Sequence, residues 1–119
     1  MCEVGFGPGV LLRLLCWRFP DARLHGGDPS GVMLGQARRR LASLRTGRGA
    51  DLRLGAVGRL PFDDAAFHVT VAVNTVAFGS DLGAGLSEIA CATRPQGEVM
   101  VAWHGGQSAV AHPTTPCPR

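Results

Sequence analysis

Short apolar runs alternate along the chain with segments in which apolar residues recur every three or four positions, and glycine or proline separates them. The clearest run, residues 67–73, is β-branched and almost wholly apolar, as expected of a parallel strand buried on both faces. Shorter or weaker strands are predicted over residues 1–4, 23–27, 52–54 and 98–103. Helices are predicted over residues 10–19, 30–44 and 82–92.

Two of these helices carry further detail. In the first, Leu11, Leu14 and Leu15 recur at helical steps, and Pro20 ends the segment. The second follows Asp28-Pro29-Ser30, and Ser30 is placed to cap its first turn. The alternation of strands and helices predicts an α/β layered fold. Residues 1–104 are expected to form its core, and residues 105–119, dominated by Gly, Ser, Pro and Thr, are expected to be a disordered tail.

Composition narrows the class of protein. The 119 residues suffice for one domain, and 45% of them are hydrophobic, which is enough for a single core. The net charge is +3 and every basic residue is arginine, which a GC-rich coding region explains more simply than phosphate recognition. The triplet at residues 38–40 is interpreted as a solvated helix face, and no nucleic-acid partner is expected because no aromatic residues are interleaved. No membrane span or signal peptide is seen, so a cytoplasmic location is expected.

The four cysteines show no metal-ligand spacing, so neither a zinc site nor a disulfide framework is expected. Cys2, Cys16 and Cys91 lie in apolar segments and are interpreted as small buried residues. Cys117, in the predicted tail, is interpreted as a free thiol.

The candidate chemistry lies in Glu3-Val4-Gly5-Phe6-Gly7-Pro8-Gly9, between a predicted strand and a predicted helix. Such a turn lets a ligand approach the backbone and directs the free N–H groups of the helix toward it. Asp28 closes the second strand, where nucleotide-binding α/β folds place an acid for ribose hydroxyls. A dinucleotide site would want Gly or Ala at Val10, which disfavours a nicotinamide dehydrogenase. A G-x-G-x-G loop preceded by Glu3 instead suits S-adenosylmethionine, with Glu3 orienting the loop or meeting the ligand's amino group.

Four segments in order resemble the class I S-adenosylmethionine-dependent methyltransferases of the ubiquinone and menaquinone biosynthesis type. They are the glycine loop at 3–9, the segment at 28–38, the loop at 60–67 and the turn at 94–97. The resemblance implies a Rossmann-like three-layer sandwich with a mostly parallel sheet. It also implies S-adenosylmethionine as cofactor and methyl transfer as the activity. The expected acceptor is a small molecule, and no catalytic base can be named.

The resemblance also implies roles for matching positions. Gly5, Gly7 and Gly9 would underlie the methionine part, and Asp28 would bond the ribose hydroxyls. The other cofactor-binding residues implied are Glu3, Phe6, Pro29, Met33, Ala56, Val57 and Asn74. Plainer interpretations remain open: Gly5 and Gly7 as a tight turn only, Asp28 as a helix-flanking acid, Met33 as core, and Asn74 as a strand end.

Several positions depart from the family pattern. Ala56 stands where an acid accepts the adenine amino group, and Gln96 replaces a glycine, which strains the turn if the site needs a positive φ. His68 stands where an acid is usual and is not interpreted as a base. The first strand is short and segments usual at both ends are missing, so the fold is expected to be incomplete, with the strand at 98–103 an exposed edge prone to self-association. The alternative hypothesis is a non-catalytic or decayed cofactor-binding fragment that acts as an interaction module.

Overall fold

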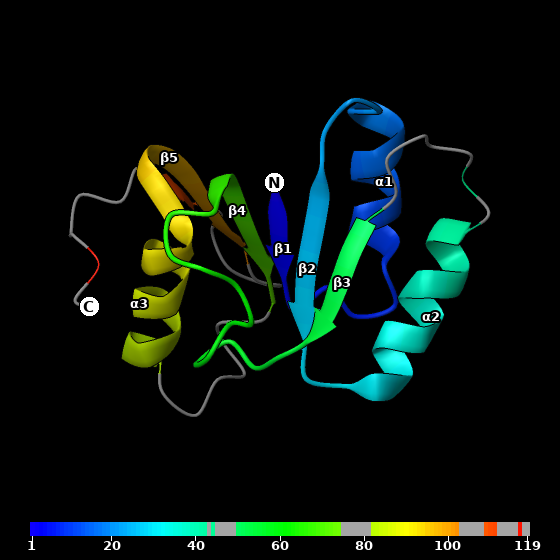
Figure 1. Cartoon of the computed structure of the whole chain (residues 1–119), viewed down its shortest axis with the longest axis horizontal. Coiled ribbons are helices and arrows are strands. Elements are labelled where there is room, and N and C mark those ends of the chain that lie inside the picture. Colours follow the sequence, from blue (N-terminus) through cyan, green and yellow to red (C-terminus); the bar gives the residue numbers. More distant parts are fainter. Residues whose placement is uncertain (43, 45–49, 75–81, 103–108, 112–116, 118–119) are drawn as a thin grey trace.

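A computed structural model describes residues 1–42, 44, 50–74, 82–102, 109–111 and 117. A six-stranded sheet in the order β3-β2-β1-β4-β5-β6 forms its centre. The strands are β1 (Cys2–Val4), β2 (Leu24–Asp28), β3 (Ala50–Leu54), β4 (Phe67–Val73), β5 (Thr93–Ala102) and β6 (Ala109–Ala111). All pairings are parallel except that of β5 with β6. The predicted Rossmann-like, mostly parallel α/β fold is therefore confirmed (Figure 1).

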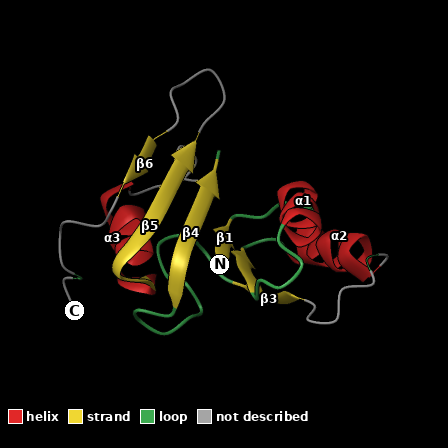
Figure 2. Cartoon of the chain, turned by 90° about the horizontal axis from the view of Figure 1, so that it is seen from above, coloured by secondary structure: helices red, strands yellow, loops and turns green. Residues whose placement is uncertain are grey.

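Within the described residues, three helices lie on the two faces of this sheet: α1 (Val10–Arg18), α2 (Gly31–Ala42) and α3 (Leu82–Ala92). Figure 2 shows α1 and α2 on one side of the strands and α3 on the other. The two faces carry separate apolar clusters. One joins Phe6, Leu12 and Leu52 with the buried face of α2, and the other joins Val4 and Ala72 of the strands with Ile89 and Ala92 of α3.

A side-chain cap explains where α2 begins, whereas the packed face of α1 differs from what its leucine spacing suggests. The Ser30 Oγ atom accepts a hydrogen bond from the Met33 N–H at 3.2 Å, so the predicted cap of α2 is confirmed. In α1 the buried residues are Leu12 and Cys16, whereas Leu14 is 56% exposed. The leucine spacing thus predicted the helix correctly, but it does not identify the buried face, because Leu14 is exposed. Because α1 is apolar nearly all round, the periodicity of its sequence does not determine which side packs on the sheet.

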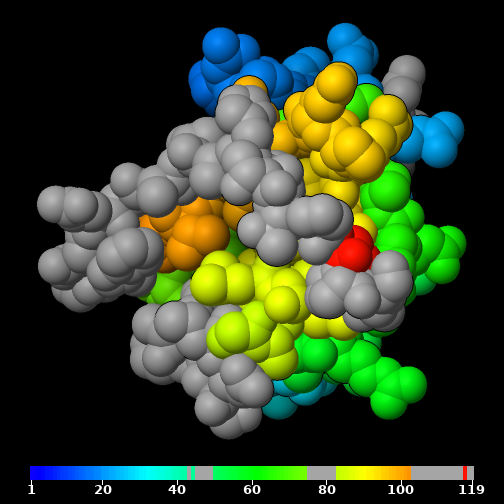
Figure 3. Space-filling model, turned by 90° about the vertical axis from the view of Figure 1, so that its left-hand side faces the viewer, coloured from blue at the N-terminus to red at the C-terminus, as the bar shows by residue number. Residues whose placement is uncertain are grey.

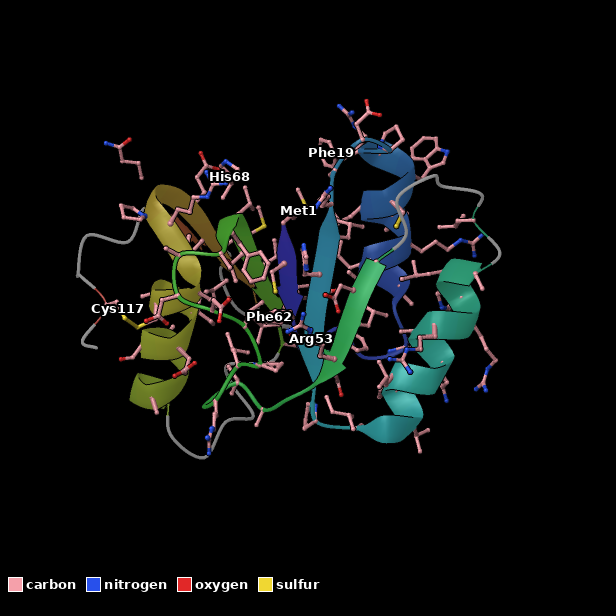
Figure 4. All side chains as sticks on the ribbon, in the orientation of Figure 1. Met1, Phe19, Arg53, Phe62, His68 and Cys117 are labelled. Carbon is pink, nitrogen blue, oxygen red and sulfur yellow. A yellow bond between two sulfur atoms is a disulfide. The ribbon has the colours of Figure 1, made fainter. Side chains whose placement is uncertain are left out.

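The C-terminal region departs from the sequence-based expectations. Residues 109–111 of the expected tail form β6, which pairs antiparallel with β5, so β5 is not the exposed edge that was expected. Cys117 forms a disulfide with Cys91, so the expected free thiol is wrong. Figure 3 shows the face of the molecule that carries α3 (yellow), and Figure 4 labels Cys117 beside this helix. The other residues of the expected tail, and Trp103 of the predicted fifth strand, lie outside the described residues.

Gln96 stands in the turn near the start of β5, at a position where the family usually has glycine, and strain was expected there. Gln96 has a φ of 69°, the left-handed region that disfavours residues with a Cβ. Next to it, a Cβ on Gly97 would lie 2.7 Å from the His68 carbonyl oxygen, so only glycine fits there. The expected strain at Gln96 is thus present in the backbone geometry.

Candidate functional site

The glycine loop connects β1 to α1 at the carboxyl edge of the sheet. Gly5, Gly7 and Gly9 have φ values of 70°, 56° and 87°, so all three adopt the left-handed conformation that glycine allows without strain. Gly9 also caps α1, and no side chain among the described residues makes a capping hydrogen bond there, so the first N–H groups of the helix remain available. A Cβ on Gly7 would meet no atom within 4 Å, so the space beside this residue is open. The loop therefore presents bare backbone and a helix N-terminus to a ligand.

Asp28 fixes this loop from the end of β2. Its Oδ2 atom accepts a hydrogen bond from the Gly7 N–H, and its Oδ1 atom accepts one from the Ser30 N–H, each at 2.9 Å. The side chain is only 6% exposed. Because each carboxylate oxygen has more than one lone pair, Asp28 keeps acceptor capacity for a hydroxyl donor while it holds the loop.

The loop after β3 joins the same edge through the backbone. The Gly55 N–H donates to the Asp28 carbonyl at 3.0 Å, as the Gly5 N–H donates to the Gly27 carbonyl at 2.7 Å. Ala56 is exposed, and its carbonyl accepts from the Arg59 N–H in a tight turn at 3.0 Å. Val57 instead points toward α3, since a Cβ on Gly85 would lie 3.3 Å from its Cγ2 atom. These backbone hydrogen bonds hold the carboxyl ends of β1, β2 and β3 together as one continuous surface.

The side chain of Arg53 holds the next part of this loop. Its Nη1 atom donates to the Pro61 carbonyl at 2.8 Å, and its guanidinium carbon lies 5.0 Å from the centre of the Phe62 ring. Figure 4 shows Arg53 and Phe62 at the carboxyl edge, whereas His68 lies toward the opposite edge. Its position at the amino end of β4 is consistent with the view that His68 is not a base at this site.

Glu3 is a buried carboxyl group beneath the glycine loop. Its side chain is 3% exposed, and its Oε1 atom has no hydrogen-bond partner among the described residues. Burial, and secondarily the negative charge of Asp28, raise the pKa of Glu3 to about 8. The protonated form therefore predominates at neutral pH. A buried polar atom without a partner is costly in a folded protein, and such an atom beside a ligand loop is a candidate ligand contact.

The remaining candidate residues are divided between the edge and the core. Phe6 is 4% exposed and packs over Gly26, so only its backbone belongs to the loop surface. Pro29 is exposed next to Asp28, and Met33 is half-buried one turn into α2. Asn74 follows β4 with a φ of 59°, and its N–H donates to the Ala102 carbonyl at 2.7 Å. A strand end in this conformation is compatible with both interpretations of Asn74.

Two residues that shape the candidate site, Gly26 and Arg40, were not predicted from the sequence. A Cβ on Gly26 would lie 2.7 Å from the Phe6 ring and 3.1 Å from the Glu3 carbonyl oxygen, so this glycine permits the close approach of β2 to the loop. The Gly26-Gly27 pair was the available signal. The Arg40 Nε atom donates to the Pro8 carbonyl at 3.0 Å, a contact between distant residues for which the sequence offers no signal.

Comparison with known proteins assigns the family. A model of the methyltransferase domain family matches residues 1–97. The chain belongs to this family. An uncharacterized methyltransferase of Bacillus subtilis is 31% identical to this methyltransferase domain over 83% of the chain and 52% of its own length. A malonyl-[acyl-carrier protein] O-methyltransferase of Halorhodospira halophila is 32% identical over 89% of the chain and 35% of its own length.

A solved structure of similar fold comes from Methanococcus maripaludis and is described as a putative S-adenosyl-L-methionine-dependent methyltransferase. It superimposes with a TM-score of 0.81 at 23% identity, covering 89% of this chain and 48% of that one. The methyltransferase domain thus spans about half the length of the Bacillus and Methanococcus proteins. Among the described residues, no helix is long and apolar enough to cross a membrane.

Proposed function

We propose that this domain binds S-adenosylmethionine at the carboxyl edge of β1, β2 and β3, and supports methyl transfer to a small-molecule acceptor. The observation that carries the proposal is the bond from the Gly7 N–H to Asp28, which brings a glycine loop and a ribose-type acid together at 2.9 Å. Open α/β sheets bind ligands at this edge, so the position agrees with general architecture as well as with the family. The expected location is the cytoplasm.

The residues present fit such a cofactor. The open space beside Gly7 accommodates a ligand close to the backbone, and the free N–H groups of α1 suit its carboxylate. The partnerless Oε1 of Glu3 suits the amino group, directly or through water. Asp28 would accept from the ribose hydroxyls. Pro29 and Met33 would border the ribose or adenine, and the turn at Ala56 and Val57 would border the adenine.

The bound cofactor would supply a methyl group attached to a positively charged sulfur. That sulfur leaves readily, because it becomes a neutral thioether when the methyl group is transferred. The domain's own residues then contribute proximity and orientation, which account for a large part of many enzymatic rate enhancements. Asn74, at the carboxyl end of β4, would lie near the reacting methyl group of the cofactor. No general base is proposed, so the acceptor would have to bring its own reactive lone pair or a base from elsewhere.

Calorimetry with S-adenosylhomocysteine and with NAD tests the proposal. We expect S-adenosylhomocysteine to bind and NAD to bind more weakly, because Val10 stands where a dinucleotide loop wants glycine or alanine. Tighter binding of NAD would overturn the assignment. The assignment would also be overturned if S-adenosylhomocysteine bound but the amide NMR signals that it shifted belonged to residues other than 3–9 and Asp28.

A further inference from the structure

The arginine groove, a hollow of about 530 Å³ between α1 and α2, is lined by Arg13, Gln36, Arg39 and Arg40. Of the four described residues that line it, three are cationic, and they come from two helices. The arginine triplet of the sequence is thus divided: the Arg38 side chain leaves the groove and donates to the Leu52 carbonyl at 3.3 Å. The groove therefore forms only when α1 and α2 pack together, and the three consecutive arginines at residues 38–40 did not indicate it.

Within the part of the chain that the structure describes, no carboxylate forms an ion pair with Arg13 or Arg39, the two exposed arginines of the groove. The ion pairs there, His25 with Asp51 and Arg53 with Asp51, lie elsewhere, and no acidic residue lines the groove. Like charges gathered in one hollow repel each other, and their field is focused there, so an anion would be attracted and would relieve the repulsion.

The position of Arg13 strengthens this argument. Arg39 and Arg40 lie in the last turn of α2, where a cation is favoured by the helix dipole without any ligand. Arg13 is the fourth of the nine residues of α1, outside the last turn, so the helix dipole does not favour a cation at this position. Its placement is explained by a ligand more readily than by helix stability.

We propose that the arginine groove binds a phosphorylated small molecule. Guanidinium groups match phosphate oxygens with paired N–H donors, and Gln36 adds an uncharged amide donor and acceptor. The volume lies within the range of small-molecule sites, roughly 300–1,000 Å³. The groove adjoins the cofactor loop through the Arg40–Pro8 bond but shares no residue with the proposed cofactor site, so the two proposals fail independently.

Titration of the 119-residue chain with inorganic pyrophosphate, followed by calorimetry and by NMR shifts of the Gln36 side-chain amide, tests this inference. The double variant Arg13→Gln/Arg39→Gln should bind at least about tenfold more weakly, since two charge-assisted contacts are lost. The matched control, Arg23→Gln/Arg94→Gln, removes the same charge from exposed positions outside the groove and should bind like the parent. Circular dichroism melts should be similar for all three proteins, because every substituted side chain is exposed.

Three results would overturn the proposal. The first is that the parent fails to bind pyrophosphate at millimolar concentration. The second is an equal loss in the control variant, which would indicate a general charge effect. The third is arginine-dependent binding of a short single-stranded oligonucleotide without any binding of pyrophosphate, which would make the groove a nucleic-acid surface instead.

Discussion

The carboxylate of Asp28 lies 2.9 Å from the Gly7 nitrogen, so the end of β2 holds the loop that follows β1. The same carboxylate also accepts from the N–H of Ser30, the residue that caps α2. One side chain thereby sets both the shape of the loop and the start of the next helix. If the proposed cofactor binds at this loop, its binding and the local order of the loop are coupled through Asp28.

Asp28→Ala should weaken binding of S-adenosylhomocysteine by about 1.5–3 kcal/mol, the usual value of hydrogen bonds to a charged group. Part of the effect would come from the released Gly7 N–H. Asp21→Ala, which removes an exposed acid from another loop, is the control and should leave the affinity unchanged. Calorimetry gives both values. An Asp28 variant that binds like the parent would place the site elsewhere.

Gly7→Val should abolish binding of the same ligand, because the branched side chain would fill the open space beside the loop. It should also lower the free energy of unfolding by about 1–2 kcal/mol, since valine would be forced to a φ near 56°. Gly35→Val introduces the same side chain into space equally free of neighbours, but on a helix and without a positive φ. This control should fold and bind. Chemical denaturation and calorimetry separate the two effects, and retention of binding by Gly7→Val would refute the loop assignment.

Glu3 should make stability depend on pH, because its folded pKa of about 8 exceeds the unfolded value of 4.5. Below pH 4.5 both states hold the proton. Between pH 4.5 and 8 the unfolded state loses its proton while the folded state retains it, so stability falls as pH rises, by up to about 1.4 kcal/mol per pH unit. Glu3→Gln should remove this slope. Urea titrations across this range check it, and parallel slopes for parent and variant would contradict the assignment.

Ala56→Asp should tighten cofactor binding by about 1.5–3 kcal/mol at most, if the new carboxylate accepts from the adenine amino group. Ala56 is exposed, so the longer side chain has room and its desolvation is incomplete. An inosine analogue, which lacks the amino group, should gain nothing. Equal gains for the two ligands, or no gain for either, would show that this turn does not border the adenine.

The layered fold could be predicted because its signals are local. The apolar run of β4, the cap at Ser30 and the glycine loop each depend on a few adjacent residues. The buried face of α1 could not be predicted, since apolar residues lie on most sides of this helix. Its packing also depends on a close approach to α2, because a Cβ on Gly9 would lie 3.0 Å from the Ala37 Cβ atom. Strand β6 could not be predicted either, because it has only three residues and no distinctive pattern.

The sequence indicated candidate residues for a cofactor site, which stay a prediction, but it did not indicate the contacts between them. The spacing of Gly7 and Asp28 indicated a ligand edge, yet the bond between them depends on the parallel pairing of β1 with β2. The burial of Glu3 depends in the same way on the place of β1 in the sheet, between β2 and β4. Likewise, Cys91 and Cys117 stand 26 positions apart, and no cysteine spacing indicated their bond.

That bond closes a covalent ring from Cys91 to Cys117, and both β5 and β6 lie within it. Exchange of an edge strand between two copies requires the strand to leave its own molecule and reach the other. With Cys117 anchored beside its own α3, β6 cannot be exchanged unless the ring is opened by reduction. In the oxidised chain, association through this side of the sheet is therefore limited to contact along the outer edge of β6, with each copy retaining its own strands.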